Sequence, residues 1–319
     1  MAAALVGLLA VTLDGAAQPA ARMRQIGVVL LAQLPKPYME AFRQEMRAHG
    51  YVEGRSIGIE FRFAEGKADR LPALVEDLVR RKVDVLVVES GAAALAAKQA
   101  TRTIPIVMGV AGDPLSSGVV TNLARPGGNI TGSTLQAPEL SAKRLQLLKE
   151  TLPKISAVSV IYNATNPASQ RYLEETKSAA RSLGIELHIV TVRSPTELEA
   201  AFQAVDQARP GALMTLADGM LFGSRTRIAE FAARSRLPGI FPEREFAEAG
   251  GFMSYGPSVL DVWRRSVVHV DRILKGANPG DLPIESPAKF ELIINLKTAK
   301  ALGLAISPSL LTRADAIVQ

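Results

Sequence analysis

The chain contains the apolar run Ile26-Gly27-Val28-Val29-Leu30-Leu31, and its second half repeats this kind of run as Ala157-Val158-Ser159-Val160-Ile161-Tyr162. Helix-like and strand-like segments alternate after each run. Strands that alternate with helices at this spacing predict parallel, right-handed βαβ units. We therefore expect the α/β class, with two doubly wound parallel-sheet lobes and a ligand cleft between them, because small ligands bind at such interfaces.

The spacing of apolar residues predicts the elements of the first half. Tyr38, Phe42 and Met46 are four residues apart, which indicates one face of a helix that ends at Gly50. Residues 57–63 alternate strictly between apolar and polar positions, which is typical of a strand near the edge of a sheet. Residues 83–88 are apolar except for Asp84, which predicts a buried parallel strand.

The second half continues the same rhythm. We expect each lobe to hold a parallel sheet, and the tail to add two helices around one more strand. The predicted strands are residues 157–162, 186–192, 212–216, 239–241 and 290–294, and the main predicted helices are residues 168–183, 196–208 and 222–234.

Composition supports two domains and excludes several classes of chemistry. The 319 residues are enough for two lobes of ordinary size. The absence of cysteine excludes disulfides, thiolate catalysis and Cys-ligated metals. The net charge of +6 comes from scattered clusters such as Arg80-Arg81-Lys82 and Lys143-Arg144. No aromatic residues interleave with them, so we interpret them as solvated helix faces and expect no nucleic-acid partner.

The N-terminus has the pattern of an export signal. Residues 2–13 are an apolar run of suitable length, and small residues of the kind that signal peptidase cleaves follow it. No basic residue precedes Arg22, so the alternatives are a true start that lies upstream of Met1 and a structured N-terminal arm. We expect residues 1–21 to be a signal-like segment and the protein to be periplasmic or otherwise exported, and no later segment is apolar enough to span a bilayer.

Common enzyme motifs are missing from the sequence. It has no Walker loop, no G-x-G-x-x-G after a strand, no H-E-x-x-H and no G-x-S-x-G elbow. The histidines are His49, His188 and His269, and we interpret them as structural or surface residues because no triad order accompanies them. We expect no enzyme, no metal and no cofactor. The alternative is an enzyme that uses Asp113 or Asp218 as acid or base.

Polar loops follow the predicted strands of the first lobe, where open α/β sheets bind ligands. Ser90, Gly91, Ala92 and Ala93 stand at a helix N-terminus, whose free N–H groups favour an anion such as a carboxylate. An ordinary N-cap at Ser90 is the simpler interpretation, and the two can coexist. Asp113 follows the next strand and suits an ammonium or hydroxyl, although an Asx turn explains it equally well.

Similar loops follow the strands of the second lobe. Asn163 comes directly after one predicted strand and Asp218 two residues after another, where their side chains can reach the cleft. The pair Glu243 and Arg244 stands after residues 239–241, with a surface ion pair as the alternative. Tyr255 lies at a crossover between lobes, where its ring can stack on a ligand or pack the hinge.

Around these loops the chain resembles the ABC transporter substrate-binding proteins with a type I periplasmic-binding fold, the group that includes tryptophan and tyrosine binders. The resemblance runs almost continuously from Phe42 to Asp315. It is carried by Gly112-Asp113-Pro114, by Leu123-Ala124-Arg125-Pro126-Gly127-Gly128-Asn129-Ile130-Thr131-Gly132 and by Gly250-Gly251-Phe252-Met253-Ser254-Tyr255-Gly256. The missing basic signal is the one departure from the family pattern.

The resemblance implies an exported Venus-flytrap protein that closes on a small molecule and passes it to a membrane permease. It implies three crossovers, with residues 24–132 and 258–284 in one lobe and residues 133–257 and 285–319 in the other. A helix N-terminus near Ser90 suits a carboxylate, and Asp113 or Asp218 suits an amine. We therefore expect an amino acid, aromatic or branched, as the ligand, with an aromatic carboxylate as the alternative. A sensor domain on the same fold is a further alternative. By similarity, the ligand would contact Gln33, Leu34, Ser90, Gly91, Ala92, Ala93, Asp113, Asn163, Asp218, Arg244 and Tyr255.

Overall fold

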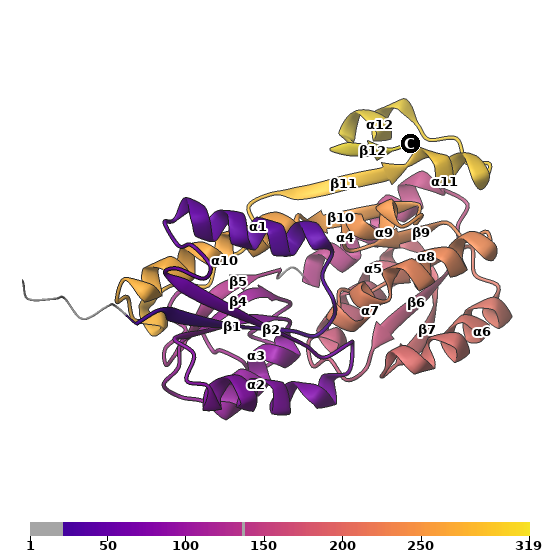
Figure 1. Ribbon diagram of the computed structural model, residues 1–319. Helices are drawn as coiled ribbons and strands as arrows, with labels where there is room; N and C mark the ends of the chain where they lie inside the picture. Colours follow the sequence, from indigo (N-terminus) through magenta and orange to yellow (C-terminus); the bar gives the residue numbers. More distant parts are fainter. Residues whose placement is uncertain (1–21, 136–137) are drawn as a thin grey trace, which may run out of the picture.

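A computed structural model describes residues 22–135 and 138–319, so the predicted signal-like segment lies outside the described residues. Within them the chain forms two sheets that lie side by side, each covered by helices (Figure 1). We call the five-stranded sheet with its helices the first lobe and the seven-stranded sheet with its helices the second lobe. The predicted α/β fold class is confirmed.

The first lobe has the strand order β2-β1-β3-β4-β5, and all four pairs of neighbours are parallel. The helix α10 arrives from much later in the chain and packs on β4, β5 and α1. Its elements are β1 (Arg24–Leu30), α1 (Lys36–Ala48), β2 (Ile57–Phe63), α2 (Leu71–Arg80), β3 (Val85–Glu89), α3 (Gly91–Ala100), β4 (Ile106–Ala111), β5 (Ile130–Thr134) and α10 (Val259–Leu274).

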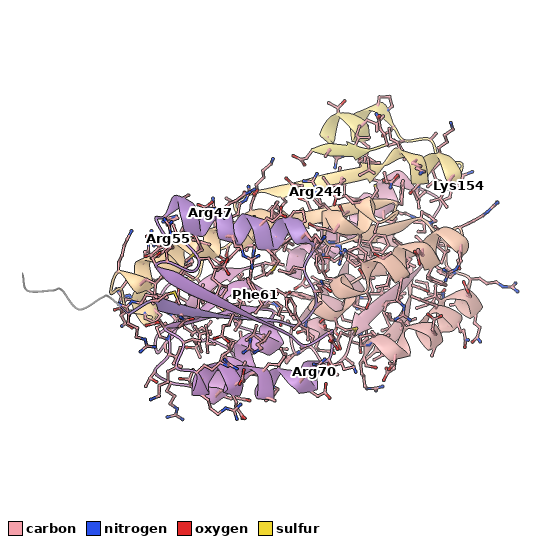
Figure 2. The ribbon with its side chains drawn as sticks, in the orientation of Figure 1. Arg47, Arg55, Phe61, Arg70, Lys154 and Arg244 are labelled. Atoms are coloured by element: carbon pink, nitrogen blue, oxygen red, sulfur yellow. The ribbon has the colours of Figure 1, made fainter. Side chains whose placement is uncertain are left out.

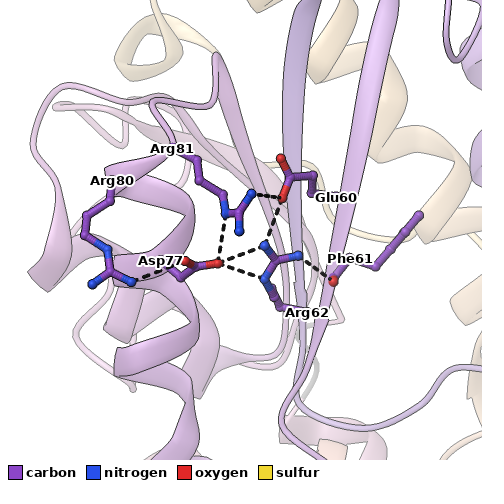
Figure 3. A network of polar contacts seen from close by, with 6 residues as sticks. All are labelled: Glu60, Phe61, Arg62, Asp77, Arg80 and Arg81. Carbon is purple, nitrogen blue, oxygen red and sulfur yellow. Dashed lines mark hydrogen bonds and ion pairs between the residues drawn. The ribbon is translucent and has the colours of Figure 1, made fainter.

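The strand β2 lies at the edge of its sheet, as its alternating sequence predicts. A polar network ties this edge strand to α2 (Figure 3). Arg62 Nε on β2 donates to Asp77 Oδ2 on α2 at 3.0 Å, and Arg81 Nε donates to the same oxygen at 3.1 Å. The charged side chains also protect an exposed sheet edge from pairing with another chain.

The second lobe has the strand order β12-β11-β10-β9-β8-β6-β7. Seven of its elements, five strands and two helices, follow the predicted ranges within a few residues. Its elements are α4 (Pro138–Thr151), β6 (Ala157–Asn163), α5 (Ser169–Leu183), β7 (Glu186–Val192), α6 (Leu198–Ala208), β8 (Ala212–Thr215), α7 (Gly219–Gly223), α8 (Arg225–Arg234), β9 (Gly239–Phe241), α9 (Arg244–Glu248), β10 (Met253–Pro257), β11 (Phe290–Asn295), α11 (Leu296–Ala301), α12 (Pro308–Arg313) and β12 (Ala316–Val318).

The expectation of a purely parallel second sheet is wrong at one pair. The strands β10 and β11 are antiparallel, with Met253 opposite Ile294 and Pro257 opposite Phe290. The chain leaves the second lobe through β10, builds α10 on the first lobe, and returns through β11. Because it returns at the end of the sheet where it left, β11 must run in the opposite direction.

The single helix predicted over residues 222–234 is two helices. The short helix α7 begins after Asp218, whose carboxylate caps it by accepting hydrogen bonds from Met220 N and Leu221 N. It ends at Gly223, and α8 starts after Ser224. The turn between them lets the chain change direction directly beside the first lobe.

A buried indole joins the helix α10 to the rest of the first lobe. The side chain of Trp263 has no exposed surface, and its Nε1 donates to the carbonyl oxygen of Tyr38 at 3.1 Å. A Cβ on Gly109 of β4 would come within 2.3 Å of the Trp263 ring, so glycine is required there for the close approach. The exact lobe boundaries at the three crossovers stay a prediction. Among the described residues no helix is both long and apolar enough to cross a membrane.

Candidate ligand-binding site

The strand orders of the two sheets place a crevice in each lobe. In both sheets the first strand lies between the second and the third, so the connections diverge at β1 and β3 and at β6 and β8. Ligands of open α/β sheets bind outside the carboxyl ends of the strands at such points. The two crevices face one another across one cavity, and its polar lining comprises Glu89, Ser90, Asn163, Thr165, Asn166, Arg193, Asp218 and Glu243.

Ser90 has a strained backbone at this cavity. Its φ of 121° and ψ of 155° fall in a region that is almost restricted to glycine. Its hydroxyl caps α3 by accepting a hydrogen bond from Ala93 N at 3.2 Å. Gly91 and Ala92, the first two residues of this ten-residue helix, line the cavity. This end of α3 favours a negative group of a ligand.

Asp218 organises the second-lobe side of the cavity. Its Oδ1 accepts from Met220 N at 2.9 Å and from Leu221 N at 3.0 Å. Its Oδ2 accepts from the side-chain amides of Asn163 and Asn166, both at 3.0 Å. Burial raises the pKa of the Asp218 carboxyl, and these four donors oppose that effect. The carboxylate is thus fully hydrogen-bonded within the protein.

Two further carboxyl groups, Glu89 and Glu243, line the cavity from opposite lobes. Burial raises the pKa of each to about 8. Glu89 Oε2 accepts a hydrogen bond from Leu31 N at 3.1 Å, which opposes the shift, whereas the charge of Asp218 adds to it. For Glu243 the guanidinium of Arg144 opposes the shift. The cavity therefore contains more acidic groups than it has buried cations.

Arg144 corrects one expectation from the sequence. We interpreted Lys143-Arg144 as part of a solvated helix face, but the Arg144 side chain is buried. Its Nε donates to the carbonyl oxygen of Tyr255 at 2.7 Å, and burial lowers its pKa to about 10 while Glu243 opposes that shift. The helical pattern around residue 144 gives no sign of this inward position.

The remaining wall of the cavity is apolar. It combines aliphatic side chains from both lobes with one aromatic ring, that of Phe222, and Arg225 lies over this ring at 4.9 Å. The apolar residues are Leu31, Leu34, Ala68, Ala92, Val110, Leu135, Ala217, Met220, Phe222 and Val259. Such a lining with a few polar groups is typical of a small-molecule site.

Six of the eleven residues predicted to contact a ligand line this cavity: Leu34, Ser90, Gly91, Ala92, Asn163 and Asp218. Two others lie next to it in the first lobe but are not part of its lining. Gln33 is exposed to solvent, and Ala93 is buried in α3 behind the cap. The roles of all these residues in binding stay predictions.

Asp113 adopts the Asx turn that was the alternative interpretation. Its Oδ1 accepts from Leu115 N at 3.1 Å and from Ser116 N at 3.0 Å. Its Oδ2 lies 3.4 Å from Arg171 Nη1 on α5, so the carboxylate joins the two lobes rather than facing the cavity.

Arg244 and Tyr255 also point elsewhere. Arg244 pairs with Glu248 and with Glu291 on β11, both at 3.1 Å, and Figure 2 shows it on the β11 side of the molecule. The Tyr255 ring packs against Phe290 at 6.4 Å. Consecutive residues after a strand point in different directions, so it is Glu243, not Arg244, that reaches the cavity.

No group of three or more His, Asp or Glu side chains that could hold a metal ion occurs in the part of the chain that the structure describes. The polar lining is arranged for hydrogen bonding and for charge recognition.

Comparison with known proteins identifies the family. The model of the ABC transporter substrate binding protein family matches residues 36–318. The chain belongs to this family. Its fold is therefore the type I periplasmic-binding-protein fold, as the sequence resemblance implies.

Individual relatives agree with the family match. A tyrosine-binding protein of Clostridioides difficile is 26% identical over 286 residues, which is 89% of this chain and 82% of that protein. A conserved domain protein of Vibrio cholerae has a solved structure with a TM-score of 0.87 and 26% identity, covering 93% of this chain and all of that one. An ABC domain from Streptococcus pneumonia, solved with L-Trp, gives a TM-score of 0.84 at 24% identity, over 92% and 100% of the two chains.

Proposed function

We propose that this substrate-binding protein is exported and captures an amino acid with an aromatic or branched side chain for an ABC importer. The lobes close on the ligand and present it to the permease, and no chemical step is needed. The names of the relatives support this class of ligand, since one binds tyrosine and another was solved with L-Trp. The family match supports an exported protein with a permease as partner.

The charge distribution of the cavity is the observation that carries the proposal. Glu89 and Glu243 are buried on opposite sides of one cavity, and Asp218 lies beside them. An ammonium group would compensate these carboxylates, because a charge buried without a partner is very unfavourable. The N-terminus of α3 would hold the α-carboxylate of the same ligand, with Ser90 beside it.

The apolar wall would accommodate the ligand side chain. Phe222, Leu31 and Leu34 offer one ring and two aliphatic groups. This combination fits an aromatic or branched side chain, and a ring stacked on Phe222 would add to the burial of apolar surface.

The acidic groups of the cavity give less support to the two alternatives, an aromatic carboxylate ligand and an enzyme. An aromatic carboxylate would bring a second anion to the acidic groups without an ammonium to compensate them. An enzyme that uses Asp218 as acid or base would need a carboxylate with a free acceptor position, but four donors occupy it. In Asp113 the carboxylate is engaged in a turn and an ion pair.

Isothermal titration calorimetry with matched ligands tests the proposal. We expect L-tryptophan, L-tyrosine or L-leucine to bind one per chain. The deaminated analogue of whichever binds, in which hydrogen replaces the ammonium group, should bind at least a hundredfold more weakly. A deaminated analogue that binds as tightly as the amino acid would support the aromatic carboxylate instead. Conversion of the bound amino acid during the titration would support an enzyme.

A further inference from the structure

The short helix α7 of the second lobe packs tightly against the first lobe. A Cβ built on Gly223 would lie 2.6 Å from Ala32 Cβ, much closer than two such atoms come in proteins. A Cβ on Gly219, one turn earlier, would lie 3.2 Å from Leu31 Cδ2 and 3.5 Å from Ser90 Cβ. Ala32 is the second residue after β1 and Ser90 is the first after β3, so two glycines of α7 lie against the carboxyl ends of these strands.

Other contacts between the lobes surround this one. The Tyr38 ring of α1 meets the Phe222 ring of α7 edge to face at 6.5 Å, and its hydroxyl donates to Glu245 of α9. On another side, Arg171 of α5 pairs with Asp113 of the first lobe. These side chains can adapt by changing rotamer. The contact between Gly223 and Ala32 cannot, because Ala32 Cβ is fixed to the backbone of its lobe.

We propose that Gly223 is a positioning residue that sets how far the two lobes close. A methyl group at residue 223 would overlap with Ala32 Cβ. The lobes would have to separate to relieve this overlap, since both atoms are fixed to the backbone. This inference rests on the proposed function only in assigning ligand capture to the closed arrangement. The contact between Gly223 and Ala32 limits how far that arrangement can close.

A disulfide between the lobes can measure closure without any ligand. The chain has no cysteine, so an introduced pair is free of competing thiols. Ser90→Cys with Gly219→Cys places the two Cβ atoms 3.5 Å apart, at the short end of the range for disulfides. This double-cysteine variant is the parent, and each further substitution is made in it. The purified parent is oxidised in glutathione buffer, and the remaining free thiols are counted over time. Its rate of cross-linking reports how often the lobes reach the described arrangement.

We expect the parent to cross-link and Gly223→Ala to slow the reaction at least tenfold. Adding Ala32→Gly to Gly223→Ala should restore the parent rate, because the nearest remaining atom is Ala32 Cα at an ordinary 3.9 Å. Ala32→Gly without the Gly223 change should cross-link as fast as the parent. Ala32→Val tests the same contact from the first lobe and should also slow the reaction, because two methyl groups on Cβ leave little rotamer freedom to avoid Gly223. This variant covers the case in which Gly223→Ala fails to fold.

Three results would overturn the inference. They are cross-linking of Gly223→Ala at the parent rate, no recovery in the double variant, and a parent that does not cross-link at all. Because no ligand is used, these results are independent of the calorimetry that tests the proposed function. A protein that binds no amino acid can still show slower cross-linking in Gly223→Ala, and a protein that binds one can lack this effect.

Discussion

Asn163 Nδ2 lies 3.0 Å from Asp218 Oδ2 and donates a hydrogen bond to it, which joins the carboxyl ends of the neighbouring strands β6 and β8. The Asn163 Oδ1 is also engaged, because it accepts from Thr165 N at 2.9 Å. These bonds hold the second-lobe side of the cavity in one arrangement before any ligand arrives. A site organised in this way loses less conformational entropy on binding.

Replacing Asp218 with asparagine should destabilise the protein by about 2 kcal/mol or more. Asparagine offers one acceptor oxygen where four donors converge, so buried N–H groups lose their partners at about 1–3 kcal/mol each. Urea denaturation measures the change. Ser307→Ala is the matched control. The Ser307 hydroxyl caps α12 by accepting from Leu310 N and also contacts the exposed Ser309 hydroxyl at 3.1 Å, and loss of a cap costs about 1 kcal/mol. Equal losses in the two variants would contradict the convergence of donors on Asp218.

The stability of the ligand-free protein should fall as the pH rises from 5 to 8. Burial raises the pKa of Glu89 and Glu243 from 4.5 to about 8, so the folded protein binds protons in this range that the unfolded chain releases. Their contribution to stability is therefore complete below about pH 4.5 and lost as the pH rises to 8. Each group contributes a slope of up to about 1.4 kcal/mol per pH unit.

The variant Glu89→Gln isolates one of these groups. Glutamine keeps an acceptor for Leu31 N but does not ionise, so the free energy of unfolding should depend less on pH. Urea denaturation at pH 5 and at pH 8 should show the variant close to the wild type at the lower pH and more stable than it at the higher. An unchanged slope would mean that Glu89 ionises in the folded protein as it does in water.

Two substitutions at Ser90 should have opposite effects. Ser90→Gly relieves the backbone strain at φ 121°, which is worth about 1–3 kcal/mol, and glycine is nearly as good an N-cap as serine. Ser90→Ala keeps the strain and loses the cap, at about 1 kcal/mol. Thermal or urea denaturation should therefore rank the glycine variant above the wild type and the alanine variant below it. The reverse order would show that the backbone of Ser90 is relaxed.

Binding of an amino acid should tighten as the pH rises from 6 to 8. Pairing with an ammonium group requires ionised carboxylates, and protonation of Glu89 or Glu243 below pH 8 competes with it. The dissociation constant should change by up to about tenfold per pH unit for each carboxylate that must ionise. Calorimetry across this range measures it, and Glu243→Gln should flatten the profile. Affinity that does not vary with pH would place the ammonium elsewhere.

Much of the fold could be predicted from the sequence because its patterns are local. The alternation in residues 57–63 predicts an edge strand, and β2 lies at the edge. The direction of β11 could not be predicted, since it depends on where the chain re-enters the second lobe. The break at Ser224 was missed because Leu221, Ile228 and Ala232, on the two sides of the turn, keep the spacing of one helical face.

The candidate site was predicted at the level of strand ends and less well at the level of side chains. Ser90, Asn163 and Asp218 line the cavity because they follow strands at the points where the connections diverge. The sequence does not show whether Glu243 or Arg244 faces the cavity. The two residues are adjacent and their side chains point in different directions, so the direction of the backbone after β9 decides it. Arg144 lies on a helix whose buried face depends on how α4 packs beneath the sheet, and a single sequence does not contain that information.

Native mass spectrometry of the protein, purified from the cells that make it, tests the binding-protein account most directly. The account predicts one small molecule per chain that is released on denaturation and has the mass of an amino acid with an aromatic or branched side chain. Release of a molecule without an amino group would contradict the assignment of Glu89 and Glu243 to an ammonium. A chain that carries no ligand and binds no amino acid at pH 8 would contradict the account as a whole.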